Sequence, residues 1–214
     1  MNPRAVSITT VLAAVKSRDL IGLDDVKTAL GLADGSADVF LTKQITFASA
    51  AIAQHCNRVF QVEQVKDEFW PARDAHLQVI EGVAPLQLSR WPVQEITEVL
   101  EFGSVLTDGT DYRIDAEDGQ LHRLDGISYP RRWLPEAISV TYSAGFDPIP
   151  PDVQDAAIRL VSARYHERGR DPYLRRKAVP GVSDKEWWIP NGPNGNLTPD
   201  IADILDNYRV PVIA

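Results

Sequence analysis

The sequence contains very little sulfur. Among its 214 residues there are one cysteine, Cys56, and one methionine. A single cysteine excludes an intrachain disulfide, and this usage is typical of a protein that assembles in a reducing compartment. Because Cys56 continues an apolar helical stripe, we interpret its thiol as a small buried group of the core.

Long hydrophobic runs are also missing. The longest segment that leans apolar, residues 5–15, is interrupted by Ser7, Thr9 and Thr10. It is much shorter than the roughly 20 residues that a membrane-spanning helix needs. Only Arg4 precedes it as a basic residue, which is not the pattern of a secretory signal. We therefore expect a globular protein with no membrane partner.

The motifs of common enzyme and metal sites are absent. The four histidines, His55, His76, His122 and His166, lie far apart, and none has a partner at metal-ligand spacing. The sequence has no phosphate-binding glycine loop, no dinucleotide-binding glycine motif and no nucleophile elbow. We therefore predict no catalytic residue, no cofactor and no metal ion.

Basic residues are outnumbered by acidic residues in the chain as a whole, but one stretch is basic. The net charge is −8 and the sequence pI is about 5.0, which does not favour general nucleic-acid binding. The stretch from Arg159 to Lys177 nevertheless has a net charge of +5, which leaves −13 for the rest. Either a solvated helix face or a patch that docks on an acidic neighbour explains this stretch. Within it, Arg168, Arg175 and Arg176 are candidates for contacts between subunits.

Helical periodicity is present in three main places. The spacing of apolar residues and the capping residues predict helices over about 23–31, 37–56 and 151–168. The second helix contains several alanines, including Ala48 and Ala51, so another backbone can approach it closely. Its neighbour is either a helix of the same chain or a second subunit, and both alanines are therefore candidate intersubunit residues.

Between these helices the pattern changes to short alternating strands. The β region covers about residues 60–144, and the Asp-Gly pairs at 108–109 and 118–119 are typical of tight hairpins. We predict an α+β fold, in which a small helical bundle carries an inserted antiparallel β meander and extended terminal arms. Residues 1–16 are the N-terminal arm, either a short strand or a frayed helix, and residues 17–169 are the main domain.

The C-terminal arm, residues 170–214, is rich in proline and glycine. Only residues 199–207 have a helical pattern, and Pro211 favours an extended end. The adjacent Trp187 and Trp188 either fold back over their own domain or lie against another chain. Because aromatic residues are enriched in interface cores, we favour an intersubunit contact for both. The acidic Asp184 and Glu186 before them argue against base stacking with nucleic acid.

Five motifs in order resemble the head-tail connector (adaptor) proteins of tailed bacteriophages and gene transfer agents. They are residues 17–32, the helix that ends in Cys56-Asn57-Arg58-Val59-Phe60, Leu88-Ser89-Arg90-Trp91-Pro92-Val93, the pair Asp111–Ile114 and Gly119–Leu124, and Val140–Phe146. The resemblance covers about residues 17–170.

The resemblance implies a structural protein of the virion neck, without catalysis. Such a protein forms an oligomeric ring, typically of twelve subunits, between the portal protein and the stopper or tail-completion protein. DNA passes through its channel without specific binding, and the particle is assembled in the host cytoplasm. The helical bundle would form the ring body and the C-terminal arm would engage the portal. In this chain the expected portal contacts are Tyr208, Arg209, Val210, Pro211, Val212 and Ile213.

Two other functions stay open at this point. A DNA-binding packaging factor would use the basic stretch 159–177 and would show strongly salt-dependent affinity. A particle-associated hydrolase is favoured only by the many carboxylates and aromatic residues. It would require a cleft with two facing carboxyl groups about 5–10 Å apart.

Overall fold

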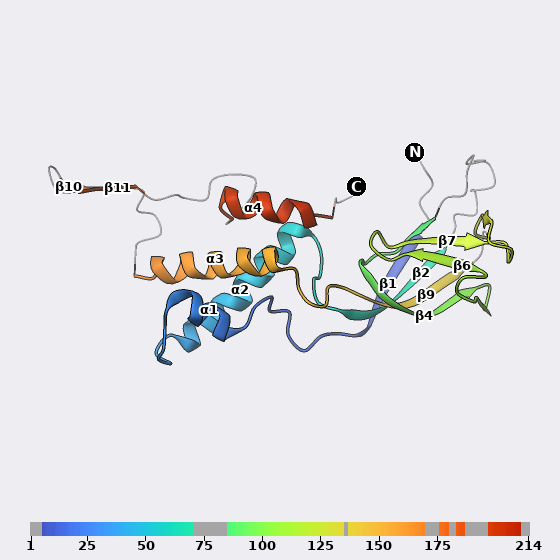
Figure 1. Cartoon of the computed structure of the whole chain (residues 1–214), viewed down its shortest axis with the longest axis horizontal. Coiled ribbons are helices and arrows are strands. Elements are labelled where there is room, and N and C mark those ends of the chain that lie inside the picture. The colour runs from blue at the N-terminus through green and yellow to red at the C-terminus, as the bar shows by residue number, and fades with distance from the viewer. Residues whose placement is uncertain are drawn as a thin grey trace. The chain divides into compact units, whose positions relative to one another are not determined.

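The chain folds into two compact units. The computed structural model describes residues 6–70, 85–134, 137–169, 176–179, 183–186 and 197–210. Residues 1–16 and 61–147 form one unit, which we call the β unit, and residues 17–60 and 148–214 form the other, the helical unit (Figure 1). The chain therefore leaves the β unit after its first strand, returns for the other strands, and ends in the helical unit.

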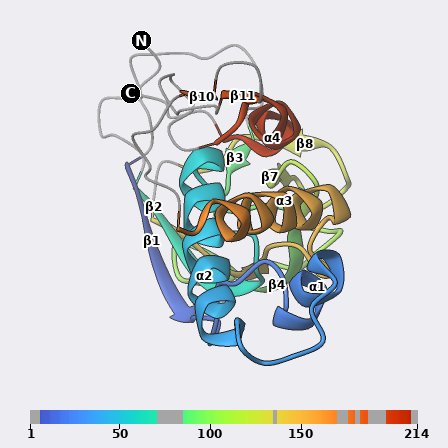
Figure 2. The same ribbon diagram turned by 90° about the vertical axis from the view of Figure 1, so that its left-hand side faces the viewer.

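The helical unit is built around one central helix. Its helices are α1 (Leu23–Leu30), α2 (Asp38–Cys56), α3 (Pro151–Glu167) and α4 (Pro199–Leu205), followed by a 3-10 turn, η2 (Asp206–Tyr208). Helix α3 packs against α1, α2 and α4, and Figure 2 shows it lying across α2. The core consists mainly of aliphatic side chains, among them Val26, Leu41, Ile45, Ile52, Leu160, Val161 and Leu205.

Local sequence explains where these helices begin and end. Helix α1 stops at Gly31 and α2 at Asn57, which have positive φ angles of 67° and 49°. Glycine and asparagine tolerate this left-handed conformation best, so both helices end where such a residue follows. Helix α3 begins at Pro151, whose missing N–H costs nothing in a first helical turn.

The β unit contains two antiparallel sheets. The first has the strand order β1-β2-β9-β4-β5. Its strands are β1 (Val6–Ala13), β2 (Glu63–Trp70), β4 (Val93–Glu101), β5 (Ser104–Val105) and β9 (Ile138–Ala144). The second has the order β3-β7-β6, with β8 also paired to β7. These strands are β3 (Leu86–Gln87), β6 (Tyr112–Asp115), β7 (Gln120–Leu124) and β8 (Pro130–Arg131).

Both sheets contribute to one apolar core. Strands β2 and β9 alternate strictly between buried and partly buried residues, as expected for strands with one face inside. The core includes Val65, Leu88, Val99, Leu121, Val140 and Tyr142. Gly145 ends β9 at a φ of 139°, and a Cβ atom there would overlap the carbonyl group of Gln61. Glycine is therefore required where the chain leaves the sheet.

The α+β class is confirmed. Strands β6, β7 and β8 pair in sequence order, as in a meander, whereas the first sheet has a different strand order. Strand β9, the last in sequence, lies between β2 and β4. Its four inward residues, Ile138, Val140, Tyr142 and Ala144, are almost completely buried. A strand with this much apolar surface is most stable in the middle of a sheet, where both of its edges are also paired.

The terminal segments contain regular structure. Residues Val6–Ala13, for which the sequence left a short strand or a frayed helix open, form strand β1 and pair with β2. Helix α4 buries Ile201, Ala202 and Leu205 in the helical unit. Strands β10 (Arg176–Val179) and β11 (Ser183–Glu186) form a separate antiparallel hairpin. Apolar burial and backbone pairing thus order parts of both arms.

In the part of the chain that the structure describes, no helix combines the length and the apolar character that crossing a membrane requires.

Candidate assembly surfaces

The segment before the C-terminus is held on its own helical unit. The Tyr208 hydroxyl donates to the Asp152 carboxylate, at 2.7 Å from each of its oxygens. The Tyr208 ring lies 6.0 Å from the ring of Phe60. Partial burial and the hydrogen bond to Asp152 raise the pKa of Tyr208 to about 12. Tyr208 therefore fixes the chain end to the start of α3.

Further contacts join this segment to the end of α2. The Val210 backbone N–H donates to the Cys56 carbonyl at 2.9 Å. His55 Nε2 lies 3.0 Å from Asp206 Oδ1. We call residues 206–210, held by these contacts and by Tyr208, the C-terminal clamp. Pro211, Val212 and Ile213 lie outside the described residues.

The two candidate alanines of α2 differ in burial. Ala48 is fully buried in the helical unit, so its side chain is not available to a neighbouring subunit. The close approach predicted at Ala48 therefore occurs within one chain, where α2 packs against α3 and α4. Ala51 is only partly buried and stays a candidate for a contact between subunits.

Three arginines of the basic stretch lie on α3 or directly after its last residue. Arg159 Nε lies 2.7 Å from Asp155 Oδ2. Arg164 is partly covered, and desolvation by burial lowers the pKa of its guanidinium. The Arg168 guanidinium stacks 4.2 Å from the Tyr165 ring centroid. Arg159 and Arg168 therefore each contact a side chain of α3.

The remaining candidates of the arm are only partly described. Arg176 is exposed on β10, and its predicted intersubunit contact stays a prediction. Arg175, Trp187 and Trp188 lie outside the described residues, so their predicted intersubunit contacts stay predictions.

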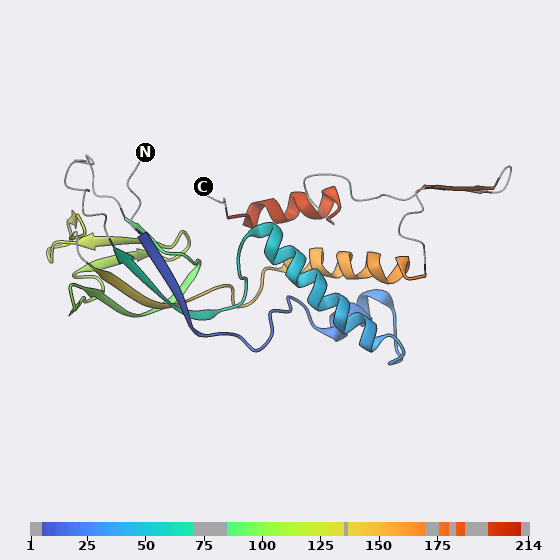
Figure 3. The same ribbon diagram turned by 180° about the vertical axis from the view of Figure 1, so that it is seen from behind.

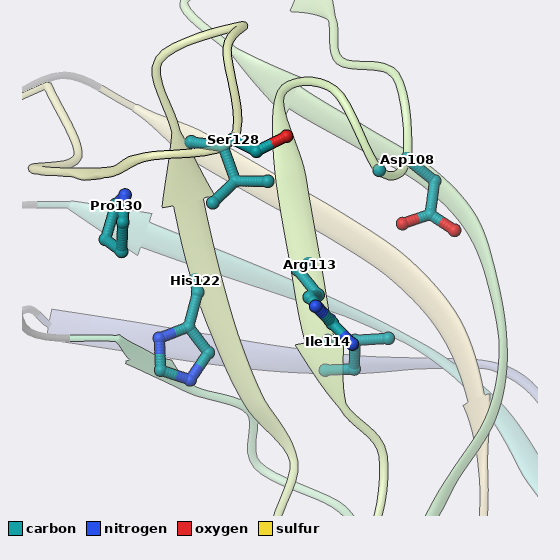
Figure 4. A pocket seen from close by; sticks show the side chains of 8 residues that line it. Asp108, Arg113, Ile114, His122, Ser128 and Pro130 are labelled. Atoms are coloured by element: carbon teal, nitrogen blue, oxygen red, sulfur yellow. The ribbon is translucent and has the colours of Figure 1, made fainter.

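A shallow hollow of about 530 Å³ lies on the second sheet of the β unit. It is lined by Asp108, Gly109, Arg113, Ile114, His122, Leu124, Ser128 and Pro130. Figure 4 shows His122 extending from β7, and Arg113 and Ile114 from the neighbouring β6. The hollow has one carboxylate, Asp108, whereas glycoside hydrolysis uses two facing carboxyl groups. Within the described residues, no group of three or more potential ligands could hold a metal ion.

The β unit buries charged side chains that tie distant strands together. Arg123 donates through Nε and Nη2 to Glu101 Oε2, at 3.0 and 2.9 Å. Arg131 Nη2 adds a third contact to the same oxygen at 3.1 Å. Asp67 is also buried and accepts hydrogen bonds from Thr9, Ser89 and Tyr142. These networks hold β4 to β7 and β8, and β2 to β1 and β9.

Large apolar residues are exposed in the turns beside the Glu101 network. Phe102, Ile127 and Tyr129 have exposed fractions of 72%, 73% and 69%. None of the three was predicted as a candidate for partner contacts. The sequence feature that could have indicated them is an apolar residue directly beside a turn glycine, as in Phe102-Gly103 and Gly126-Ile127.

Comparison with known families separates the functions that the geometry leaves open. The sequence pattern of the head completion protein family matches residues 19–210. The chain belongs to the head completion protein family. The match includes both units, from before α1 to the end of the C-terminal clamp. It confirms the resemblance to phage connector proteins and the prediction of a structural component without enzymatic activity.

Three solved structures have the same fold as this family member. They are described as the neck of an empty GTA particle computed with C6 symmetry, the virion of a native gene transfer agent (GTA) particle, and the neck of a native GTA particle computed with C12 symmetry. The identities are 15%, 14% and 16%, and the TM-scores are 0.53, 0.54 and 0.53. Each alignment covers 97% of both chains. A search of curated proteins found no match.

Proposed function

We propose that this protein is a head-tail adaptor in the neck of a phage-like particle. It forms an oligomeric ring between the portal protein and the stopper or tail-completion protein, and DNA passes through the central channel. The observation that carries the proposal is the head completion family match over residues 19–210. The fold supports it, because chains of GTA necks share this fold over 97% of their length.

The ring contains twelve subunits joined by head-to-tail contacts. A closed ring of this order needs two different surfaces on each subunit, because a self-complementary patch alone closes a dimer. The described C12 symmetry of one structurally similar neck is consistent with twelve. Ala51, Arg168 and Arg176 contribute to these contacts, and each is at least partly exposed. Arg175, Trp187 and Trp188 complete the proposed set.

The end of the chain docks on the portal. The C-terminal clamp supports this role, since Tyr208 and Val210, which precede the docking segment, are bonded to α3 and α2. Pro211 restricts the backbone, so Val210-Pro211-Val212-Ile213 loses less entropy when it binds in an extended form. In this arrangement Tyr208 and Arg209 position the segment, and Val212 and Ile213 supply the apolar contact.

Acidic side chains of the body line the channel. A cationic wall would bind the phosphates of DNA and slow its passage, whereas an acidic wall repels them. The net charge of −8 supports this proposal, as does the pairing of Arg159 with Asp155. The basic residues near Arg168 and Arg176 then face protein rather than DNA.

Native mass spectrometry and electron microscopy of the full chain with the portal protein test this function. We expect a ring of twelve chains on the portal for the wild-type protein. Removal of residues 211–214 should leave a folded chain that no longer joins the portal, because the described contacts end at Val210. Wild-type chains that occur in the particle only as monomers, or outside the neck, would overturn the proposal.

A further inference from the structure

Strand β1 leaves one edge of the first sheet open. It is the terminal strand of that sheet, so among the described residues its outer row of N–H and C=O groups faces no other strand (Figure 3). Residues 6–15 contain no charged side chain. Ile8 and Leu12 are about half exposed, at 52% and 51%. An uncharged edge with exposed apolar residues readily pairs with a further strand.

The opposite side of the same sheet is protected against such pairing. Strand β4 has two register shifts and carries the exposed Glu95 and Glu98. The short strand β5 covers its end. Bulges and charges are the usual devices that prevent edge-to-edge association. Strand β1 has one register shift, between Val11 and Ala13, and no charge. The sheet therefore has one protected edge and one receptive edge.

The β10–β11 hairpin has no further strand to pair with among the described residues. Its strands pair only with each other among the described residues, and an isolated two-stranded hairpin is marginally stable in water. The hairpin segment, residues 176–186, contains three basic and two acidic side chains, a net charge of +1. The β unit, residues 1–16 and 61–147, has a net charge of −7. The hairpin and the β unit thus attract each other electrostatically between chains.

We propose that the β10–β11 hairpin of one subunit adds to the free edge of β1 in the neighbouring copy of this chain. The contact extends the first sheet across the subunit boundary by backbone hydrogen bonds. It joins two different surfaces, so it repeats from subunit to subunit as a closed ring requires. This inference rests on the proposed ring and identifies one of its interfaces.

Cysteine cross-linking in assembled rings tests the pairing. Thr10→Cys places a thiol on β1, where Thr10 is exposed, and is combined in turn with cysteine at 176, 178, 184 or 186 of the hairpin. The native Cys56 is buried and does not interfere. After oxidation, at least one pair should give a ladder of covalent dimers, trimers and higher multimers on a denaturing gel. Thr97→Cys, exposed on the protected strand β4, is the matched control and should give no ladder.

Each alternative pairing has its own result. A covalent dimer from Thr10→Cys alone would indicate β1 pairing with β1 of another copy and would overturn the inference. A ladder with Thr97→Cys in place of Thr10→Cys would also overturn the inference. So would a disulfide that forms only within a single chain. Rings of wild-type mass that give no ladder with any pair would refute the hairpin contact and leave the ring function intact. Wild-type chains that form no ring would refute both.

A charge variant gives an independent measurement. Thr10→Lys puts a cation on the receptive edge, which should repel the basic hairpin and cause loss of the ring in native mass spectra. Thr10→Val keeps strand propensity without charge and should retain the ring. Circular dichroism of both variants checks that the chain is folded. Unchanged ring assembly by folded Thr10→Lys would contradict the inference.

Discussion

The two units of this protein differ in what their interiors contain. Four charged residues are buried in the described structure, Glu63, Asp67, Glu101 and Arg123, and all of them belong to the β unit. The helical unit buries aliphatic and alanine side chains, with Ser49 as its buried polar group among the described residues. Ser49 is satisfied locally, because its hydroxyl accepts a hydrogen bond from the Leu20 N–H at 2.9 Å.

The difference shows two ways of specifying a fold. In the helical unit, apolar residues at helical spacing create a stripe, and small residues let the helices approach closely. In the β unit, several strands have similar apolar alternation, so pattern alone does not determine which strand pairs with which. The Glu101–Arg123 and Asp67–Tyr142 contacts join strands that are distant in sequence. We infer that these polar contacts help select the strand arrangement.

Removing one partner of the buried pair should have the largest effect. Glu101→Ala leaves Arg123 buried without its carboxylate, which we expect to destabilise the β unit by about 3–5 kcal/mol. Urea unfolding monitored by circular dichroism measures the loss. The double variant Glu101→Met with Arg123→Met should recover much of it, because the charge that stays without its Glu101 partner, Arg131, is more than a third exposed. A loss below about 1 kcal/mol for Glu101→Ala would contradict the importance of the pair.

Overpacking should be the corresponding weakness of the helical unit. Ala48→Leu adds volume at a fully buried site and should cost about 1–3 kcal/mol of unfolding free energy. Ala51→Leu, at a partly exposed position of the same helix, is the matched control and should cost less. Equal losses of unfolding free energy in the two variants would mean that the burial of Ala48 does not make this site more sensitive to added volume. If only Ala51→Leu impairs ring assembly, Ala51 lies at the subunit contact.

The Cys56 thiol makes the helical unit sensitive to alkaline pH. Burial raises the pKa of Cys56 to about 12, so the folded protein keeps the proton when the unfolded chain, with a pKa near 8.5, loses it. The unfolded state is therefore favoured as pH rises, by about 1.4 kcal/mol one pH unit above 8.5. Unfolding free energies at several pH values from 7.5 to 9.5 measure this slope. Cys56→Ala should have a flatter slope, and an identical slope in both proteins would disprove the assignment.

The smallest effect is expected at the C-terminal clamp. Tyr208→Phe keeps the ring beside Phe60 but removes the hydrogen bond to Asp152, which should cost about 1 kcal/mol of stability. Hydrogen exchange at the Val210 amide should become faster, because its bond to the Cys56 carbonyl depends on the clamp. Asp152→Ala, which removes the acceptor, should have a similar effect. Unchanged exchange at Val210 in both variants would show that the clamp is held by other contacts.

Much of the helical unit and part of the candidate site follow from sequence. Helical hydrogen bonds connect residues four apart, so apolar spacing, Gly31, Asn57 and Pro151 suffice to place α1, α2 and α3. The alternation of Ile138, Val140 and Tyr142 likewise predicts a strand with one buried face. The ordered motifs led to the connector resemblance, which the family match confirms. Tyr208 and Val210 were recognised as functional candidates, although their intrachain partners were not.

Only the tertiary structure decided which distant segments meet. Strand pairing places no limit on sequence separation, so neither the position of β9 between β2 and β4 nor the pairing of β1 with β2 is encoded in a local pattern. The same is true of Tyr208 and Asp152, which are 56 residues apart. The burial of Ala48 within its own chain also depends on how the helices pack. Local hydrogen bonds and periodicity can be predicted from neighbouring residues, whereas these contacts depend on the free energy of the whole assembled core.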